Sequence, residues 1–341
     1  MPCTGLLFRW RFIATGEGYV SFLRKMNMRQ IFIIVIVTFI SLLGLLSLEA
    51  FELDKYQPYG NCKEFSEKEL NSIRSSNKPA LIMGAGIVSL ANNSTSRVGM
   101  ELLELSSRTE SSKVVAAISL INYYLDPSRA LPLNPLKEDI VRLLKDDKNN
   151  ALSYYLNALL LQEEGECQKA LDQIKKGNVH KFDCYPKQRF YAIVQAAEMA
   201  EWSGRLSREL AFWNSHSAPI YIKLRHLCRN MEKEYGQEAK DVCMVLGKNL
   251  ETASLTCVEN LLSLAIQTES LNDSPSDDVA RSEIKKRRDI AFSCGGCTSD
   301  VQEFDVTDKV DKKYYEILLD KGEVSAQKYI GDFVNQKQQG N

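Results

Sequence analysis

Cysteines are the residues of this chain whose chemistry can be read most directly from their positions. The chain has nine cysteines. Cys3 precedes an apolar segment at residues 31–48, and the others follow that segment: Cys62, Cys167, Cys184, Cys228, Cys243, Cys257, Cys294 and Cys297. An even number of cysteines in an exported region is compatible with disulfides, whereas without export these residues would be ordinary buried thiols. Their chemistry therefore depends on which side of a membrane they lie.

Cys228 and Cys243 form the most sharply defined candidate disulfide. Gly236 lies between them, eight residues after the first and seven before the second. A chain that turns at Gly236 places the two side chains at the same height on facing helices, where a disulfide can form. If Gly236 instead lies inside one long helix, the sulfurs are roughly 22 Å apart and no bond can form. The turn is favoured because glycine inside a helix costs about 1 kcal/mol.

Cys167 and Cys184 are a second candidate pair. They flank one expected helix and the loop beyond it, and a bond between them requires the chain to fold back after His180. Disulfide connectivity cannot be deduced from sequence alone, so position is the only support for this pairing.

Cys294 and Cys297 form a C-x-x-C pair in an expected loop. We expect a structural disulfide, either between the two or with one of them bonded to Cys257. The alternatives are free thiols, a redox-active pair, and a zinc site, which would need two further ligands in a chain with only 3 histidines. A redox-active pair normally lies at a helix N-terminus of a fold that contains strands, where the thiolate is stabilised. That context is not visible in this sequence.

The chain carries no Ser-His-Asp arrangement, HExxH motif, P-loop or pair of catalytic carboxylates. Gly84-Ala85-Gly86 lacks the third glycine of a dinucleotide-binding loop, and small residues that let two helices pack closely explain it better. We therefore expect no cofactor and no metal, and favour a protein that is not an enzyme. Lys+Arg 43 and Asp+Glu 44 give a net charge of -1, so nucleic-acid binding has no electrostatic support.

The apolar segment Ile31–Leu48 has the length of a membrane-spanning helix. No charge falls between Arg29 and Glu49, and a helix over this segment spans about 27 Å, close to the hydrocarbon thickness of a bilayer. Basic residues precede the segment, so its N-terminal end should face the cytoplasm and everything after it should be exported. We expect residues 1–29 to be a cytoplasmic tail and residues 30–48 to be a membrane anchor.

A cleaved signal peptide is the alternative to the anchor. Ala50 suits the position before a cut, although Leu48 is bulkier than usual two places earlier. A chain begun at Met26 or Met28 would have the usual layout of a short basic stretch and an apolar run, so residues 1–25 could be a mis-assigned start. Either way, the bulk of the chain is expected to be periplasmic or extracellular.

Helical spacing is nearly continuous beyond the apolar segment, and strand-like alternation is almost absent, which predicts an all-α fold. Ser66 with Glu69 forms a capping box, and Asn134-Pro135 places a cap and an N1 proline before LKEDIVRLLKDD. Helix lengths and short polar joints predict antiparallel helical hairpins. The remaining expected helices cover residues 79–91, 98–106, 110–125, 149–163, 167–176, 187–203, 205–214, 217–235, 237–248, 252–268, 277–292, 308–321 and 323–336.

Changes of composition suggest how the exported region is divided. We expect a helical-repeat domain at residues 62–267, a linker at residues 268–278, with the sequence TESLNDSPSDD, and a C-terminal helical region at residues 279–341. A second loop over residues 294–304 sets off the last hairpin.

Residues 151–177 carry a pattern typical of helical repeats. Tyr154 is followed by Ala158 on the same helix face, Gly165 lies at a turn, and Ala170 then faces back. This segment resembles one tetratricopeptide repeat, in which small residues lie where two helices approach closely, but it lacks the proline that often closes the unit.

Weaker versions of the pattern lie at residues 190–210, with Gly204 at the turn, and at residues 314–329, with Gly322 at the turn. The resemblance implies a degenerate helical-repeat solenoid, because a solenoid needs about three repeats to bury its faces. An irregular all-α domain with one accidental match is the alternative.

We expect a non-catalytic, membrane-anchored protein that binds or scaffolds an unidentified protein partner. The candidate surface is the first-helix face of residues 151–215. The alternatives are a thiol-disulfide enzyme that uses Cys294 and Cys297, and a cleaved, secreted protein held by disulfides. Several aromatic residues could line a peptide-binding face, although such residues more often form the core between repeats: Trp202, Trp213, Tyr154, Tyr155, Tyr314 and Tyr315.

Overall fold

The computed structural model describes residues 64–91, 96–127, 129, 131–272, 274–295 and 308–339. They belong to one compact unit formed by residues 62–341. The expected tail at residues 1–29 and the expected anchor at residues 30–48 lie outside the described residues. Among the helices that are described, none has both the length and the apolar character needed to span a bilayer.

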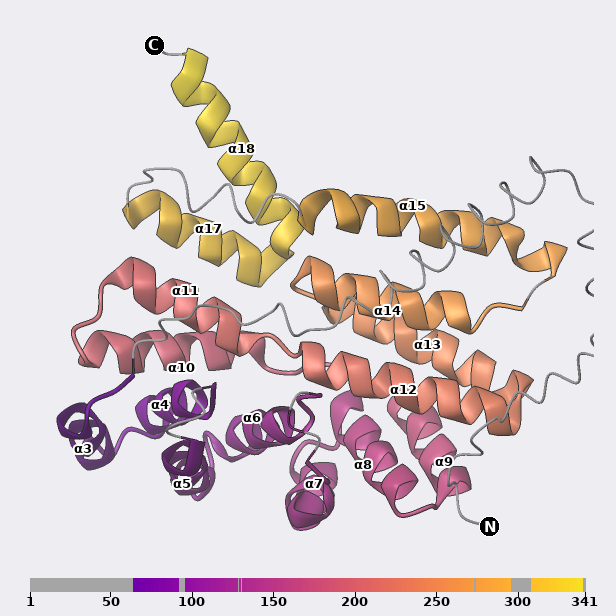
Figure 1. The fold of residues 1–341 in the computed structure, drawn as a ribbon, viewed down its shortest axis with the longest axis horizontal. Helices are drawn as coiled ribbons and strands as arrows, with labels where there is room; N and C mark the ends of the chain where they lie inside the picture. The colour runs from indigo at the N-terminus through magenta and orange to yellow at the C-terminus, as the bar shows by residue number, and fades with distance from the viewer. Residues whose placement is uncertain are drawn as a thin grey trace, which may run out of the picture. The chain divides into compact units, whose positions relative to one another are not determined.

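The all-α prediction is confirmed for the described residues, whose regular structure is helical apart from an isolated bridge between Asn150 and Lys181. Most helix positions match the hydrophobic periodicity to within a few residues. In chain order (Figure 1) the helices are α3 (Glu67–Ser75), α4 (Pro79–Ala91), α5 (Ser96–Ser107), α6 (Lys113–Tyr124), η3 (Asn134–Leu136), α7 (Lys137–Asp146), α8 (Ala151–Glu163), α9 (Cys167–Gly177), α10 (Pro186–Met199), α11 (Gly204–Ser215), α12 (Ala218–Tyr235), α13 (Gln237–Ala253), α14 (Cys257–Glu269), η4 (Pro275–Asp277), α15 (Asp278–Gly295), α17 (Asp308–Lys321) and α18 (Glu323–Gln339).

Some helix starts follow the capping chemistry of the sequence, and others have no side-chain cap. The predicted capping box of α3 is present, since Ser66 Oγ accepts from the backbone N–H of Glu69 and the Glu69 carboxylate accepts from the backbone N–H of Ser66. A second box at the start of α14, formed by Thr256 and Glu259, was not predicted. The predicted cap at Asn134 is wrong, because Asn134 is itself the first residue of the 3-10 turn η3 and α7 starts only after that turn, with Leu136 at its N-cap position.

Each of the three helix pairs with the repeat-like pattern is joined by a turn that contains a left-handed residue. Gly165 and Gly322 each have φ of +80°, as predicted for the turns after α8 and α17. The turn after α10 was predicted at Gly204, but the left-handed residue is Glu201, with φ of 57°. The turn after α8 and the turn after α10 are closed by the same pattern of backbone hydrogen bonds. After α10, the backbone N–H of Trp202 donates to the carbonyl of Ala197 at 3.0 Å.

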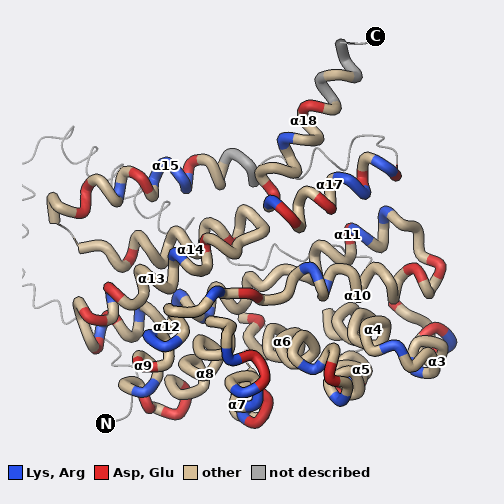
Figure 2. Tube along the Cα trace, turned by 180° about the vertical axis from the view of Figure 1, so that it is seen from behind, with Lys and Arg blue, Asp and Glu red and all other residues tan. Residues whose placement is uncertain are grey.

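The helices do not pack in simple chain order. α8 packs along α9, and this pair contacts α12 and α13, whereas α10 and α11 lie against α4 and α17 (Figure 1). α4 carries no charged residue, as its uniform tan colour in Figure 2 shows. It is buried along most of its length. A Cβ at Gly84 would lie 2.0 Å from the carbonyl oxygen of Ala192, so the small residues of α4 let α10 pack very closely.

The predicted linker at residues 268–278 joins two helices within the compact unit. α14 continues to Glu269, the turn η4 follows, and α15 then packs back along α14. Ile284 and Ala291 are 2% and 4% exposed in that contact layer. The Pro- and Ser-containing composition therefore marks a tight connection and not a boundary between separate units.

Candidate functional site

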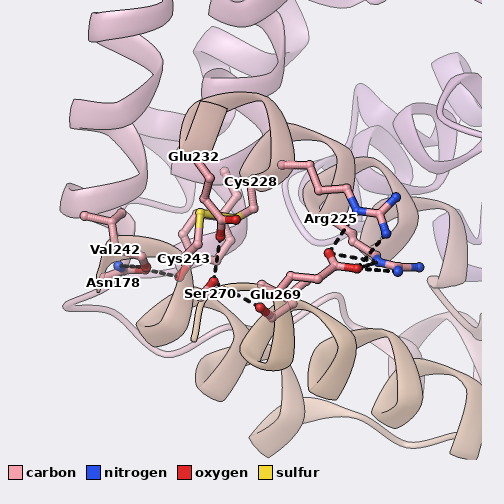
Figure 3. Close-up of a disulfide and its surroundings, with 11 residues drawn as sticks. Asn178, Arg225, Cys228, Glu232, Val242, Cys243, Glu269 and Ser270 are labelled. Carbon is pink, nitrogen blue, oxygen red and sulfur yellow. Dashed lines mark hydrogen bonds and ion pairs between the residues drawn. A yellow bond between two sulfur atoms is a disulfide. The ribbon is translucent and has the colours of Figure 1, made fainter. Parts of the chain in front are cut away.

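The structure contains the predicted disulfide between Cys228 and Cys243 (Figure 3). Gly236 ends α12 and begins α13 with φ of 57°, so the chain turns where the spacing of the cysteines requires. The Cα atoms are 5.8 Å apart, within the usual range for a disulfide. Both side chains are buried, at 2% and 0% exposed, so the bond is a structural staple shielded from thiols in solution.

Polar contacts around the disulfide connect its helix pair to α14 and α9 (Figure 3). Ser270, just after α14, donates its hydroxyl to Glu232 at 2.8 Å, and Asn178, just after α9, donates its amide to the carbonyl of Val242 at 2.9 Å. Burial raises the pKa of the Glu232 carboxyl, partly offset by the hydrogen bond from Ser270. The pair α12–α13 is thus fixed on both sides.

Glu269 is the anionic centre of this region. Its carboxylate accepts from the guanidinium groups of both Arg225 and Arg229 (Figure 3). Burial alone would raise the pKa of Glu269, but the hydrogen bonds from the two arginines outweigh it and hold the pKa below its usual value. Arg225 and Arg229 together carry one more charge than Glu269 neutralises. The pKa of the nearby His226 is lowered mainly by burial and further by these two arginines.

The predicted bond between Cys167 and Cys184 is not formed, because Cys184 carries a reduced thiol. Cys167 begins α9 beside the Gly165 turn. Cys184 follows the segment at Lys181 that pairs with Asn150, at the opposite end of α8. The length of α8, 13 residues, separates the two positions by about 20 Å. Burial raises the pKa of the Cys184 thiol to about 12.

The predicted C-x-x-C pair is only partly within the described region. Cys297 lies outside the described residues. The backbone at Cys294 belongs to the last turn of α15, which ends at Gly295, and not to a loop as predicted. Cys257 forms no disulfide, so the predicted alternative of a bond from this pair to Cys257 is wrong.

Most of the aromatic residues proposed for a binding face are core residues. Tyr155 is 0% exposed and Trp202 is 4% exposed, stacked on Phe65. Tyr314 and Tyr315 are buried as well. The more exposed members are Tyr154, which stacks on His180, and the half-buried Trp213. On α8, therefore, the buried aromatic is Tyr155, although the repeat pattern pointed to Tyr154.

A buried polar cluster that the sequence did not predict lies where α10, α12 and α14 meet. Arg189, 1% exposed, donates to the hydroxyl of Ser217 at 2.8 Å and to backbone carbonyls of Asn214 and His216. Glu259, 2% exposed, accepts from the backbone N–H of Ser217 at 2.7 Å. Burial lowers the pKa of His216. The cluster closes the junction between two helix pairs.

A pocket of about 200 Å³ lies where the ends of α14, α15 and α18 converge. Two aliphatic side chains at its edge are unusually exposed for their type: Ile290 at 56% and Val324 at 46%. Inside, the starts of α14 and α18 are tied together, since the N–H of Cys257 donates to Glu323 Oε2 at 2.6 Å and the N–H of Glu323 donates to the carbonyl of Leu255 at 2.8 Å. The pocket therefore combines a hydrogen-bonded junction of two helix starts with exposed aliphatic side chains.

The carboxylates of this pocket are already engaged within the protein. Glu251 accepts from Arg287 at 2.5 Å and from the Gln267 amide at 2.7 Å, and Glu323 accepts from the backbone of α14. Lys321 also lines the pocket and is exposed. Within the described part of the chain, no ion pair with Lys321 is formed. The charge left available to a ligand is thus positive.

Within the described residues no group of three or more His, Cys, Asp and Glu side chains is arranged to hold a metal ion. The described region contains a buried disulfide and a small, partly apolar pocket in which the Lys321 ammonium forms no ion pair with described residues. No protein-family model, curated protein or solved structure matches this chain.

Proposed function

We propose that this chain is a membrane-anchored, extracytoplasmic protein that binds a protein partner without catalysing a reaction. Residues 30–48 anchor it with the N-terminus in the cytoplasm, and the helical region projects on the other side. The observation that carries the binding role is the pocket between α14, α15 and α18, whose rim exposes Ile290 and Val324. Exposed aliphatic side chains around a concave site are typical of surfaces that a partner covers.

The proposed location is supported by two independent features. Basic residues precede the apolar segment 31–48 and acidic residues follow it, which favours export of the C-terminal region. The disulfide Cys228–Cys243 is of a kind that persists in oxidising compartments and is rare in the cytosol.

The proposed helical-repeat character is supported by the pair α8–α9. Ala158 and Ala170 are both 0% exposed, as the tetratricopeptide-like pattern requires where two helices approach closely. The left-handed Gly165 connects them. Stacked helix pairs of this kind provide extended surfaces for peptides and partner helices.

Location is tested by topology mapping of the full chain in the cell that makes it. With a tag at each end, we expect an added protease to remove the C-terminal tag from cells with a permeabilised outer barrier while the N-terminal tag stays protected. N-terminal sequencing separates the anchor from a cleaved signal, since a mature chain starting near Phe51 would contradict anchoring. Protection of the C-terminal tag would overturn export.

Partner binding is tested by photo-crosslinking in living cells. Benzoylphenylalanine replaces Ile290 or Val324 in the full chain, and Lys145 on the exposed face of α7 serves as the control position. We expect a discrete higher-mass adduct from the two pocket positions and none from the control. Adducts from none of the positions, or from all three equally, would contradict a binding role for the pocket.

A further inference from the structure

We infer that the pocket between α14, α15 and α18 binds a partner segment that presents one aliphatic or aromatic side chain next to a carboxylate. This inference rests on the proposed function, whose binding site it defines chemically. It follows from the size of the pocket, from the exposed aliphatic side chains at its edge and from the positive charge of Lys321, which forms no ion pair among the described residues.

The volume and rim determine the apolar part of the ligand. A cavity of about 150 Å³ lined by aliphatic side chains holds a benzene molecule, and this pocket measures about 200 Å³. It therefore has room for a single large apolar side chain and not for a folded element. Covering Ile290 and Val324, which are 56% and 46% exposed, removes apolar surface from water and favours such a side chain.

The charges determine the polar part of the ligand. A cationic ligand would find no available carboxylate, because Glu251 is bound to Arg287 and Glu323 holds the backbone of α14. Lys321 remains available, since it forms no ion pair among the described residues and its neighbour Asp320 pairs with Lys187 at 2.5 Å. The backbone N–H groups that begin α14 and α18 are themselves hydrogen-bonded, the first to Glu323 and the second to the carbonyl of Leu255, so Lys321 supplies the available positive charge. A carboxylate is the group that pairs with the Lys321 ammonium.

The test uses the full chain in detergent and four fluorescein-labelled peptides, with binding measured by fluorescence anisotropy. Two peptides are Gly-Ser-Gly-Asp-Phe-Gly-Ser amide and its Asp→Asn counterpart. The other two are Gly-Ser-Gly-Ser-Phe with a free C-terminal carboxylate and the same peptide as an amide. We expect saturable binding of a peptide with a carboxylate, and binding about tenfold weaker for its neutral counterpart. The two pairs distinguish a side-chain carboxylate from a chain-terminal one.

Variants connect the binding to the pocket. Lys321→Glu should weaken the carboxylate peptides about tenfold and leave the neutral ones unchanged, and Ile290→Asp should weaken all four. Lys145→Glu, which makes the same charge change on α7, should have no effect, and circular dichroism checks that each variant is folded.

Equal binding of charged and neutral peptides, insensitivity to Lys321→Glu, or no saturable binding of any peptide overturns the inference. Crosslinks from positions 290 and 324 in cells together with one of these results would reject only the ligand chemistry. Loss of the crosslinks would reject the binding function itself.

Discussion

Arg189 donates a hydrogen bond from Nη1 to the hydroxyl of Ser217 at 2.8 Å, deep between α10 and the start of α12. The same serine donates its backbone N–H to Glu259, so one small residue joins a buried cation to a buried anion without direct contact between them. A buried charge costs free energy unless it is paired or hydrogen-bonded, and the Nη atoms of Arg189 make such bonds. This arrangement leads to the first prediction.

Arg189→Met should lower the free energy of unfolding by about 3 kcal/mol, because Ser217 and two carbonyls lose their donor and Glu259 loses its nearby cation. Urea denaturation followed by circular dichroism measures the change. Arg142→Met, which removes an exposed ion pair with Asp139, should cost less than about 1 kcal/mol. The combined variant Arg189→Met with Glu259→Gln should cost less than the sum of the two single changes. Additive effects would contradict coupling through Ser217.

Removal of the disulfide by Cys228→Ala with Cys243→Ala should destabilise the protein by about 3 kcal/mol. The bond closes a loop with a sequence separation of 15, and a loop of about this length restricts the unfolded chain by that amount. Thermal or urea denaturation checks it. Each single variant should lose nearly as much as the double one, since either removes the crosslink; a single variant as stable as the native protein would contradict the bond.

The Cys184 thiol should resist alkylation in the folded protein. Burial, with a smaller effect from Glu259, raises its pKa to about 12, so at pH 8 almost no reactive thiolate is present. Iodoacetamide followed by mass spectrometry should modify Cys184 only after addition of guanidinium chloride. Rapid modification without denaturant would show that the site opens to solvent.

The same pKa shift predicts a loss of stability in alkali. In the unfolded chain the thiol ionises near its ordinary pKa of 9.0, whereas in the folded protein it stays protonated to about 12. The stabilisation is therefore complete below pH 9 and is lost as the pH rises through this interval, because the unfolded state then binds fewer protons. Between pH 9 and 11 the native protein should lose stability more steeply than Cys184→Ala. Parallel curves would contradict the assignment.

Glu201→Gly should stabilise the protein by about 1 kcal/mol. Glu201 adopts a left-handed backbone with φ of 57°, a conformation that costs a residue with a Cβ about that much and costs glycine little. Glu198→Gly, three residues earlier inside α10, should instead destabilise by about 1 kcal/mol. The opposite signs in denaturant titrations are the expected result, and destabilisation by both changes would refute it.

Hydrophobic periodicity was sufficient to locate most helices to within a few residues. The sequence LKEDIVRLLKDD has a clear apolar stripe, and α4 and α17 have the predicted bounds, Pro79–Ala91 and Asp308–Lys321. The cysteine spacing about Gly236 was equally informative, because two residues at nearly equal distances from a turn lie at the same height on facing helices.

The order in which the helices pack could not be predicted in the same way. An apolar stripe predicts that one face of a helix is buried, but it does not predict which helix covers that face. For example, α10 packs on α4 although nearly a hundred residues separate them in sequence. α8 is buried on almost every side, so it has no stripe to distinguish Tyr155 from Tyr154. The pocket depends on three helix ends that meet only after this packing is complete.

Arg189 and Glu259 were missed for a different reason. Charged residues are rarely buried, so a sequence offers no signal that distinguishes these two from exposed ones. The one indication was local, since Glu259 stands three residues after Thr256 in the order of a capping box.

The position of the disulfide has a mechanical consequence. A pulling force applied to the two ends of the chain passes directly from Cys228 to Cys243 through the sulfur atoms and leaves the enclosed turn at Gly236 without tension. About 50 Å of contour length is thereby withheld from any extension of the chain. Under tension the α12–α13 pair can separate from its neighbours, but its two helices stay tethered to each other for as long as the covalent bond is intact.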